Sequence, residues 1–380
     1  MGVTLIIPFI NEFVEQLGGD ERHAGFLLAS YALMQFIFAP VLGKISDKYG
    51  RRPILLLGMV GAFIAFLIFG IANQLWLLFA SRMLAGLANA NISVAQAYIA
   101  DITTREERAG KMGIIQAAFS LGFIVGFPIG GVLAEQFSVA TPSLLAAFLS
   151  LINGFFAYFF LPESLKPENR ITEKLSLNPL SIAKHSLTNI IQYFGKSNFQ
   201  PLLIIFLLYS FAFSILHVTF VEFDREYLEM NPQEIGFIFM YIGIVGFFIQ
   251  MIAIKPLVRK FGEEKVMILG FLSMATGLTI TPMVDHMNWL FLTSLFVAGG
   301  NSLLAPTATA IISQKGNESE QGVILGVTQG LGSLGRIFGP PYGGLTYHGI
   351  HMMFPFISSA VILIGSVIYY LLPKLLFNNK

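Results

Sequence analysis

Long apolar runs alternate with short polar connections over the whole chain, a pattern typical of a protein that crosses a membrane many times. A helix needs roughly 20 apolar residues to cross about 30 Å of hydrocarbon. Runs of this length cover residues 2–17, 24–46, 53–72, 75–100, 110–134, 141–162, 199–222, 233–256, 265–284, 287–312, 320–346 and 352–373. The pattern predicts an all-α integral membrane protein with twelve transmembrane helices. The first span lacks a basic leader and a small-residue cleavage site, which argues against a signal peptide.

Composition agrees with this pattern and excludes several kinds of chemistry. Hydrophobic residues make up 55% and charged residues 12% of the chain, and the mean hydropathy is +0.71, whereas soluble domains carry about 25% charged residues. The absence of cysteine excludes disulfides, thiolate catalysis and cysteine metal sites. No H-E-x-x-H helix, phosphate loop or serine elbow occurs, so neither an enzyme nor a bound metal or cofactor is predicted. The net charge of +1 says nothing about partners, and no nucleic-acid partner is predicted.

The positions of the basic residues predict the orientation in the membrane. Nineteen of the 23 lysines and arginines fall in alternate loops and in the C-terminal tail, all on one side if the N-terminus is inside. Only Arg22 and Arg225 fall on the other side, and only Arg82 and Arg336 lie within spans. By the positive-inside rule, both termini are expected in the cytoplasm.

An internal repeat divides the twelve spans into two sets of six. Residues 113–131 align without gaps on 326–344, and ten of the nineteen positions are identical. At a nearly equal offset, Gly50 and Gly58 fall on Gly262 and Gly270. The repeat predicts two pseudo-symmetric six-helix bundles, residues 1–162 and 199–380, joined by a cytoplasmic linker at 163–198. Parallel repeats of this kind suit two halves that rock about a site near the middle of the membrane.

Each copy of the repeat ends in a segment rich in glycine and proline. These residues are Gly126, Pro128, Gly130, Gly131 and Gly339, Pro340, Gly343, Gly344. Small residues allow helix backbones to approach closely in lipid. We expect the glycines to lie where the fifth and eleventh spans meet neighbours across the interface between the halves.

The turn between the second and third spans carries the most specific motif, "GKISDKYGRRPILLLG" at residues 43–58. It brings one carboxylate and two guanidinium groups to one membrane surface, where they can form ion pairs. Its residues Gly43, Asp47, Gly50, Arg51 and Arg52 resemble the signature of the major facilitator superfamily. The resemblance implies the major facilitator fold, and it implies that Asp47 lies near the cytoplasmic start of the eleventh span and favours one arrangement of the halves.

Further segments resemble the tetracycline-type multidrug proton antiporters of that superfamily. They are "SRMLAGLANA", "AYIADITTREERAGKMG", "LPES" and "GFPIGG", the last with Phe127 where the antiporters have proline. The second segment adds Asp101 and Arg108 to the conformational motif. This resemblance implies a monomeric, multi-pass protein of the bacterial inner membrane, with a small molecule and protons as its partners and lipid around it.

Polar residues inside the spans are the candidates for binding substrate or coupling protons. They are Arg82, Asn89, Ser93, Gln96, Gln116, His217, Asn301, Gln329, Arg336, Glu12 and Glu222. An intramembrane charge normally faces the bundle interior, so we expect these faces to line a water-accessible cavity. For the serines, helix packing is the favoured interpretation, and for His217 a structural hydrogen bond. The acids Glu12, Glu15, Asp101, Glu222 and Asp224 are expected to be solvated charges at the ends of spans rather than the coupling site.

Three functions remain open at this point. Proton-coupled efflux of a small amphipathic compound is the leading hypothesis. Two deep arginines without an obvious buried acid favour, as the alternative, export of an anionic metabolite, siderophore or lipid. A membrane sensor or scaffold that transports nothing is the third. Composition alone names no substrate.

Overall fold

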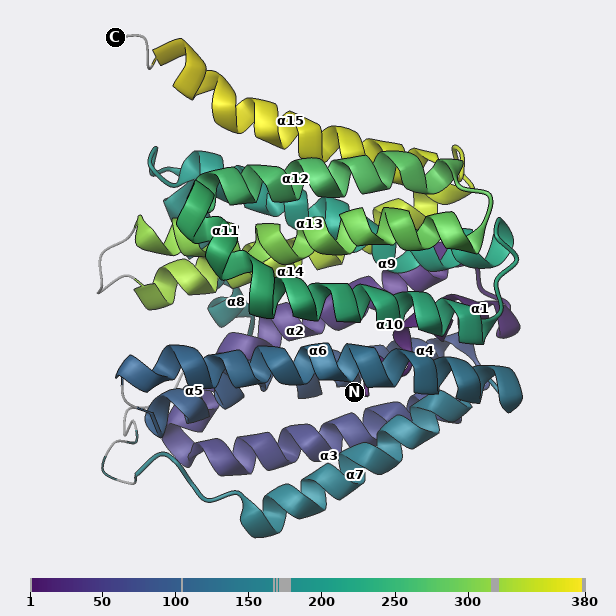
Figure 1. The fold of residues 1–380 in the computed structure, drawn as a ribbon. Coiled ribbons are helices and arrows are strands. Elements are labelled where there is room, and N and C mark those ends of the chain that lie inside the picture. The colour runs from purple at the N-terminus through teal and green to yellow at the C-terminus, as the bar shows by residue number, and fades with distance from the viewer. Residues whose placement is uncertain are drawn as a thin grey trace. The chain divides into compact units, whose positions relative to one another are not determined.

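The computed structural model describes residues 2–103, 105–166, 168, 170, 179–315 and 321–377. Every regular element among them is a helix (Figure 1). The first half contains a 3₁₀ helix η1 (Ile7–Phe9), α1 (Ile10–Gln16), α2 (Glu21–Tyr49), α3 (Arg51–Gly70), α4 (Leu75–Asn89), α5 (Ile92–Asp101), α6 (Arg105–Gln136) and α7 (Thr141–Phe160). The second half contains α8 (Pro179–Phe194), α9 (Gln200–Glu226), α10 (Pro232–Phe248), a π-helical turn η3 (Ile249–Ala253), α11 (Ile254–Phe261), α12 (Glu263–Ile280), a 3₁₀ helix η4 (Thr281–Met283), α13 (Met287–Gln314), α14 (Gln321–Tyr347) and α15 (Phe354–Phe377).

Ten helical segments among the described residues are long and apolar enough to cross a membrane. Two of them are interrupted. The segment Leu75–Asp101 changes from α4 to α5 at Ala90 and Asn91, and the segment Pro232–Phe261 passes through the π-helical turn η3. The predicted first span differs, because a 3₁₀ helix with Pro8 in its first turn precedes only seven residues of α-helix. The chain is therefore a multi-pass helical membrane protein, and the first and eleventh spans of the prediction remain expectations.

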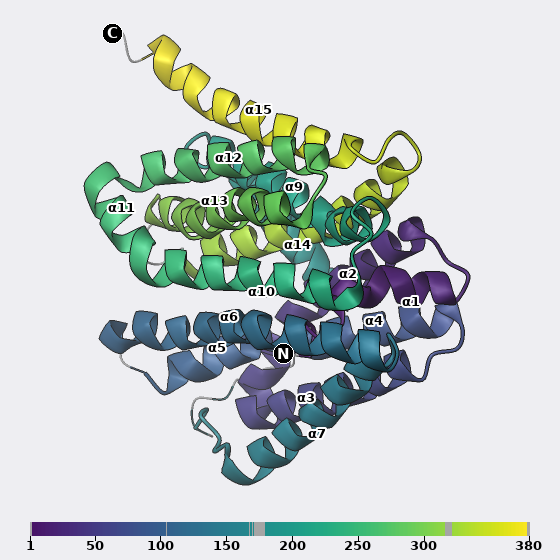
Figure 2. The same cartoon turned by 45° about the vertical axis from the view of Figure 1, so that its right-hand side comes forward.

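The helices form two compact units. Unit 1 contains Met1–Asp20 and Ser30–His185, and unit 2 contains Glu21–Ala29 and Ser186–Lys380. In unit 1, α3 packs against both α4 and α7; in unit 2, α12 packs against α13, and α9 packs against α14 and α15 (Figure 2). The first nine residues of α2, Glu21–Ala29, belong to unit 2, and the rest of this helix belongs to unit 1.

The backbone agrees with the repeat found in the sequence. Gly50 precedes α3 with φ +104° and ψ 157°, and Gly262 precedes α12 with φ +83° and ψ 155°. Residues other than glycine rarely adopt this conformation, so the same turn requires glycine in both copies. The equivalents Gly58 and Gly270 also match. Each lies so close to a carbonyl oxygen of the following long helix that a side chain does not fit.

Candidate functional site

The predicted signature turn contains a buried, charged network centred on Arg51. This residue begins α3 and is 7% exposed. Its Nη1 lies 2.5 Å from Asp47 Oδ1 and its Nε lies 3.1 Å from Asp101 Oδ2. Nη1 also donates to Ser46 Oγ at 2.7 Å, and Ser46 in turn donates to the Gly43 carbonyl at 2.6 Å. The guanidinium group therefore holds the end of α2, the start of α3 and the end of α5 together.

Glu163 completes this network from a distant part of the chain. The Arg51 amide donates to Glu163 Oε1 at 2.9 Å, and the Arg52 amide donates to Glu163 Oε2 at 3.2 Å. A carboxylate in this position satisfies two unpaired amides at the positive end of the α3 dipole. Glu163 also gives a second reason, besides the positive φ, for glycine at position 50, because a Cβ on Gly50 would lie 2.3 Å from Glu163 Oε2. Only the resemblance of "LPES" to antiporters pointed to this glutamate.

The remaining members of the predicted motif have smaller roles. Arg52 Nη2 donates to the Tyr158 carbonyl at 2.5 Å, and its guanidinium lies 5.7 Å from the Tyr158 ring. Ser164 Oγ donates to Asp101 at 3.0 Å. The side chain of Arg108 lies outside the described residues. The structure thus brings together Asp47, Arg51 and Asp101, with Ser46 and Glu163 as further members of the network.

Arg82 is the deepest charge of unit 1. It is 2% exposed, and its guanidinium lies 4.4 Å from the Phe69 ring and 5.8 Å from the Phe66 ring. Aromatic faces attract such a cation. Nε and Nη2 have no hydrogen-bond partner among the described residues, so this cation retains unused donors.

The other candidates of the same predicted span are spread along it. Asn89 donates to the Ala85 carbonyl at 3.0 Å, and Ser93 Oγ donates to the Ala39 carbonyl at 3.1 Å. Both bonds are local or packing contacts, as expected for the serine. Gln96 is exposed. The side chain of Gln116 lies outside the described residues.

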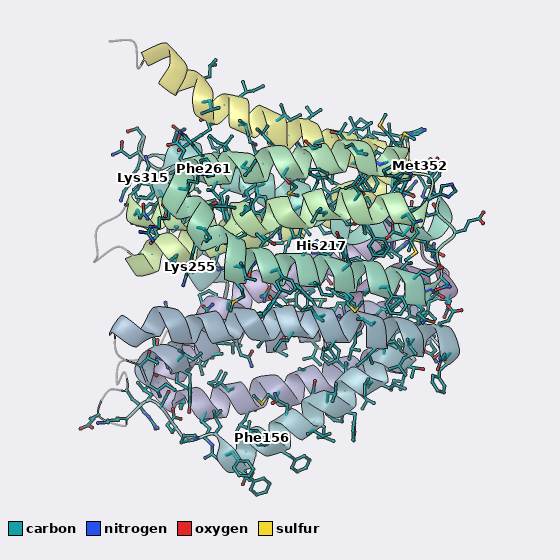
Figure 3. The ribbon with its side chains drawn as sticks, in the orientation of Figure 1. Phe156, His217, Lys255, Phe261, Lys315 and Met352 are labelled. Carbon is teal, nitrogen blue, oxygen red and sulfur yellow. The ribbon has the colours of Figure 1, made fainter. Side chains whose placement is uncertain are left out.

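Unit 2 gathers several candidates in one place. The Tyr209 hydroxyl of α9 donates to Asn301 Oδ1 of α13. Arg336 Nη2 of α14 donates to Ser333 Oγ at 3.1 Å, and its charge acts on both Tyr209 and His217. His217, labelled in Figure 3, has Nδ1 3.1 Å from the Ser214 carbonyl. Gln329 is exposed one turn before Ser333 and accepts the Ser333 hydroxyl on its backbone carbonyl at 3.1 Å.

The glycines of the two repeat elements pack differently from the prediction. Cβ atoms on Gly339 and Gly343 would lie 2.8 Å from the Phe211 carbonyl and 3.0 Å from the Ile215 carbonyl, both of α9 in the same unit. In unit 1, a Cβ on Gly130 would lie 2.6 Å from the Leu5 carbonyl. The expectation of contacts across the halves is wrong for these three glycines, because they allow close packing inside each unit.

Other members of the two elements are buried or contact α2. Gly126 and Gly131 are buried and Pro128 is half-buried. On α14, the Pro340 carbonyl lies 2.5 Å from the position of a Cβ on Gly25, and Gly344 faces the Glu21 carbonyl. These two contacts join α14 to the first turns of α2, which the sequence assigns to the other half.

The acids at the end of α9 also differ from the prediction. Glu222 and Asp224 are 1% and 0% exposed, so they are buried rather than solvated. Glu222 Oε1 pairs with Arg225 Nη2 at 2.6 Å. Glu12 on α1 is half-buried. Among the described residues, no group of three or more acids and histidines is placed to hold a metal ion.

Comparisons with known proteins agree with this architecture. The family model of the Major Facilitator Superfamily matches residues 1–253 and 202–379. The chain is 31% identical over 343 residues to the class C tetracycline resistance protein of Escherichia coli, covering 90% of this chain and 84% of that protein. It is 30% identical over 365 residues to multidrug resistance protein 2 of Bacillus subtilis (strain 168), covering 96% and 89%. Its fold is similar to the crystal structure of the human organic anion transporter MFSD10 (TETRAN), with a TM-score of 0.74 at 20% identity, covering 97% of this chain and 95% of that one.

Proposed function

The chain belongs to the major facilitator superfamily and is a membrane transporter rather than an enzyme, and we propose that it exports small amphipathic compounds in exchange for protons. The similarity to tetracycline and multidrug resistance proteins along 90% or more of the chain supports this substrate class. Transport proceeds by alternating access, in which two halves expose one site to each side of the membrane in turn.

The proposed topology has twelve spans with both termini in the cytoplasm of a bacterium, and one copy of the chain in the inner membrane forms the transporter. The bias of lysine and arginine toward one set of loops supports this orientation. Within unit 2, Lys255 and Lys315 lie at one end and Met352 at the opposite end (Figure 3), which agrees with the same bias. The first end is then cytoplasmic and the second faces outward.

The Arg51 network is the observation that carries the proposal. The Arg51 guanidinium is buried and compensated by Asp47 of α2 and Asp101 at the end of α5, while Glu163 accepts the backbone amide of Arg51. Separating a buried cation from its acids is costly, so the network stabilises one geometry of the cytoplasmic turn. Asp47 keeps about a third of its side chain exposed and can therefore accept a further partner. We propose that this further partner is the amino end of a helix, where the dipole attracts an anion.

Substrate binding is assigned to the polar groups that lie inside the units. In unit 2, Tyr209, Asn301, Arg336 and His217 offer donors and acceptors among aromatic rings, and Tyr209 lies 6.2 Å from the Phe213 ring. A few polar groups on an aromatic lining are what an amphipathic compound requires. Arg82 offers a further polar group for substrate binding in unit 1.

The experiment uses the purified chain in proteoliposomes with an imposed pH gradient, and tetracycline and ethidium as probes. We expect the gradient to drive accumulation of at least one probe, and a protonophore to abolish it. Accumulation that ignores both the gradient and the protonophore would contradict proton coupling. Absence of flux for every probe, with the protein folded, would favour a sensor or scaffold instead.

Export of an anionic compound is the second candidate function, and one observation favours it. The Arg82 guanidinium is buried with two nitrogens unpaired among the described residues, and a carboxylate would satisfy both at once. Benzoate is a suitable probe. If this candidate is right, Arg82→Lys should keep part of the benzoate flux because it keeps the charge, and Arg82→Gln should lose it. Equal benzoate flux in wild type and Arg82→Gln would exclude this role.

A further inference from the structure

Three acids occupy the last turn of α9, where the helix dipole is unfavourable for them. Glu222, Asp224 and Glu226 follow one another at alternate positions, with Arg225 among them. The carboxyl end of a helix carries partial negative charge, so acids there reduce helix stability. Two of the three carboxyls are also buried. The helix dipole and burial therefore both disfavour the charged form of these carboxyls.

Asp224 is the most unusual of the three. The residue is 0% exposed, and both of its carboxyl oxygens are buried without a hydrogen-bond partner among the described residues. A buried carboxylate without a partner is far less favourable than the neutral acid. The buried arrangement of this side chain is therefore compatible with a bound proton and strongly unfavourable without one.

A second unpaired group lies beside this end of α9. The Tyr347 hydroxyl, at the end of α14, is buried and has no hydrogen-bond partner among the described residues. Glu222, Asp224 and Glu226 all lie within electrostatic reach of this hydroxyl. A phenol both donates and accepts a hydrogen bond, so it can pass a proton between an acid and water. Two neighbouring helices thus each place an unsatisfied polar group in the same buried region.

His348 connects this region to the surface. Its Nδ1 lies 3.1 Å from Glu21 Oε1 on α2, and its Nε2 lies 3.1 Å from Glu226 Oε2 on α9. Both nitrogens can donate only when the imidazole carries two protons, so the bridge needs the charged ring. The His348 side chain is 47% exposed, whereas that of Glu21 is 10% exposed. Movement of α2 or α14 away from α9 would open this bridge and admit water to the acids behind it.

The other charged groups around the region are few. Arg225 is paired with Glu222, and Glu234 caps the start of α10 by accepting the Asn231 amide at 2.9 Å. The start of α2 carries Arg22 and His23 next to Glu21. The packed parts of α13 and α15, residues 287–314 and 354–372, contain no charged residue. Among the described residues, no cation forms an ion pair with Asp224, so a proton is what neutralises its charge.

We propose that Asp224 is the proton-carrying carboxyl of this transporter, that Tyr347 relays the proton, and that the His348 bridge closes the site. The proposal deepens the proposed function and rests on its proton coupling. When the bridge is open, the Asp224 carboxylate takes a proton from hydronium and releases water. When the bridge is closed, the neutral acid is buried as observed, and the proton is returned to water on the other side after the halves change state.

The first measurement needs no substrate. Infrared difference spectra of the purified wild type between acidic and alkaline pH should show the carbonyl band of a protonated carboxyl, shifted in heavy water. We expect the band to disappear in Asp224→Asn and to remain in the control Asp285→Asn, which removes an exposed acid between η4 and α13. Absence of the band in wild type, or its persistence in Asp224→Asn, would overturn the proposal.

The second measurement separates coupling from binding. In proteoliposomes, Asp224→Asn should lose accumulation of the probe driven by the pH gradient by about tenfold or more, but should retain exchange of labelled for unlabelled probe, which needs no net proton movement. Asp224→Glu should keep gradient-driven accumulation with a shifted pH dependence, and it serves as the test should the asparagine variant not fold. Normal gradient-driven flux in Asp224→Asn would overturn the proposal while leaving the proposed function intact. Wild-type flux that ignores the gradient would overturn both.

Discussion

Two turns of the molecule have nearly the same backbone conformation but carry different charged residues. The turn at Gly50 joins α2 to α3, and the turn at Gly262 joins α11 to α12, with nearly identical glycine conformations. After Gly50 come Arg51 and Arg52, whereas after Gly262 come Glu263 and Glu264. Acids suit the amino end of a helix and arginines do not. The second turn follows the rule for a stable helix start, and the first breaks it.

The surroundings of the two turns explain how the first tolerates its arginines. Glu163 lies against Gly50 and neutralises the start of α3, whereas the position of a Cβ on Gly262 has no atom within 4 Å. Arg51 is buried, while Arg259 and Lys260 of the second turn are exposed. Glu263 merely accepts a hydrogen bond from Gln314 at 3.0 Å. The same glycine turn forms at Gly262 without arginines after it, so the backbone does not require them in the first turn, which favours a role for the Arg51 network in the transport cycle.

The largest loss of stability and transport should follow removal of the Arg51 guanidinium, the central cation of the network. Arg51→Ala leaves Asp47 and Asp101 without the guanidinium that they share, and breaking a buried ion pair in this way costs about 3–5 kcal/mol. We expect a strongly lowered thermal midpoint in detergent and no measurable transport. The matched variant Arg259→Ala, at an exposed position of the second turn, should change stability by about 0.5 kcal/mol or less. Similar losses in the two variants would contradict the comparison.

A smaller loss of stability is expected when either of the two glycines is replaced, and the two replacements should differ in size. Alanine is strained at either position by about 1–3 kcal/mol because of the positive φ. Only Gly50→Ala also pushes a Cβ into Glu163, at 2.3 Å. Gly50→Ala should therefore lose more stability than Gly262→Ala and should also reduce transport, measured at equal amounts of folded protein. If Gly262→Ala impairs transport as much as Gly50→Ala, the network is not what makes the first turn special.

The smallest effect is expected from removing one negative charge. Glu163→Gln keeps an acceptor for one amide of α3 but loses the charge and the second strong acceptor, at a cost of about 1–3 kcal/mol. Glu263→Gln loses only an exposed charge near a helix start, worth about 0.3–1 kcal/mol. Thermal unfolding of both variants in the same detergent measures the difference. Equal shifts would mean that Glu163 does not hold the first turn.

The sequence predicted the parts of this account that depend on spacing. The offset between the copies paired Gly50 with Gly262, and the four-residue spacing placed Asp47 next to Arg51. It did not predict Glu163, because this residue lies 112 positions from Arg51 and no local pattern records such a contact. A span pattern also does not distinguish an acid at the surface from one covered by a neighbouring helix. For this reason the sequence predicts solvated Asp224 and Glu222, which are buried, and it predicts neighbours in the other half for Gly339 and Gly343, which pack against α9.

The central claim is that the charge of Asp47 in the first turn serves the transport cycle rather than the fold, and Asp47→Asn tests it most directly. Asparagine keeps the size of the side chain and removes its charge from a group that is still partly exposed, so the fold should tolerate it. The matched control is Arg259→Gln, at the equivalent position of the second turn. Gradient-driven tetracycline accumulation is measured in proteoliposomes with equal amounts of folded protein. The account predicts a loss of about tenfold or more for Asp47→Asn, a nearly unchanged thermal midpoint, and normal transport by Arg259→Gln. Normal accumulation by folded Asp47→Asn would contradict it.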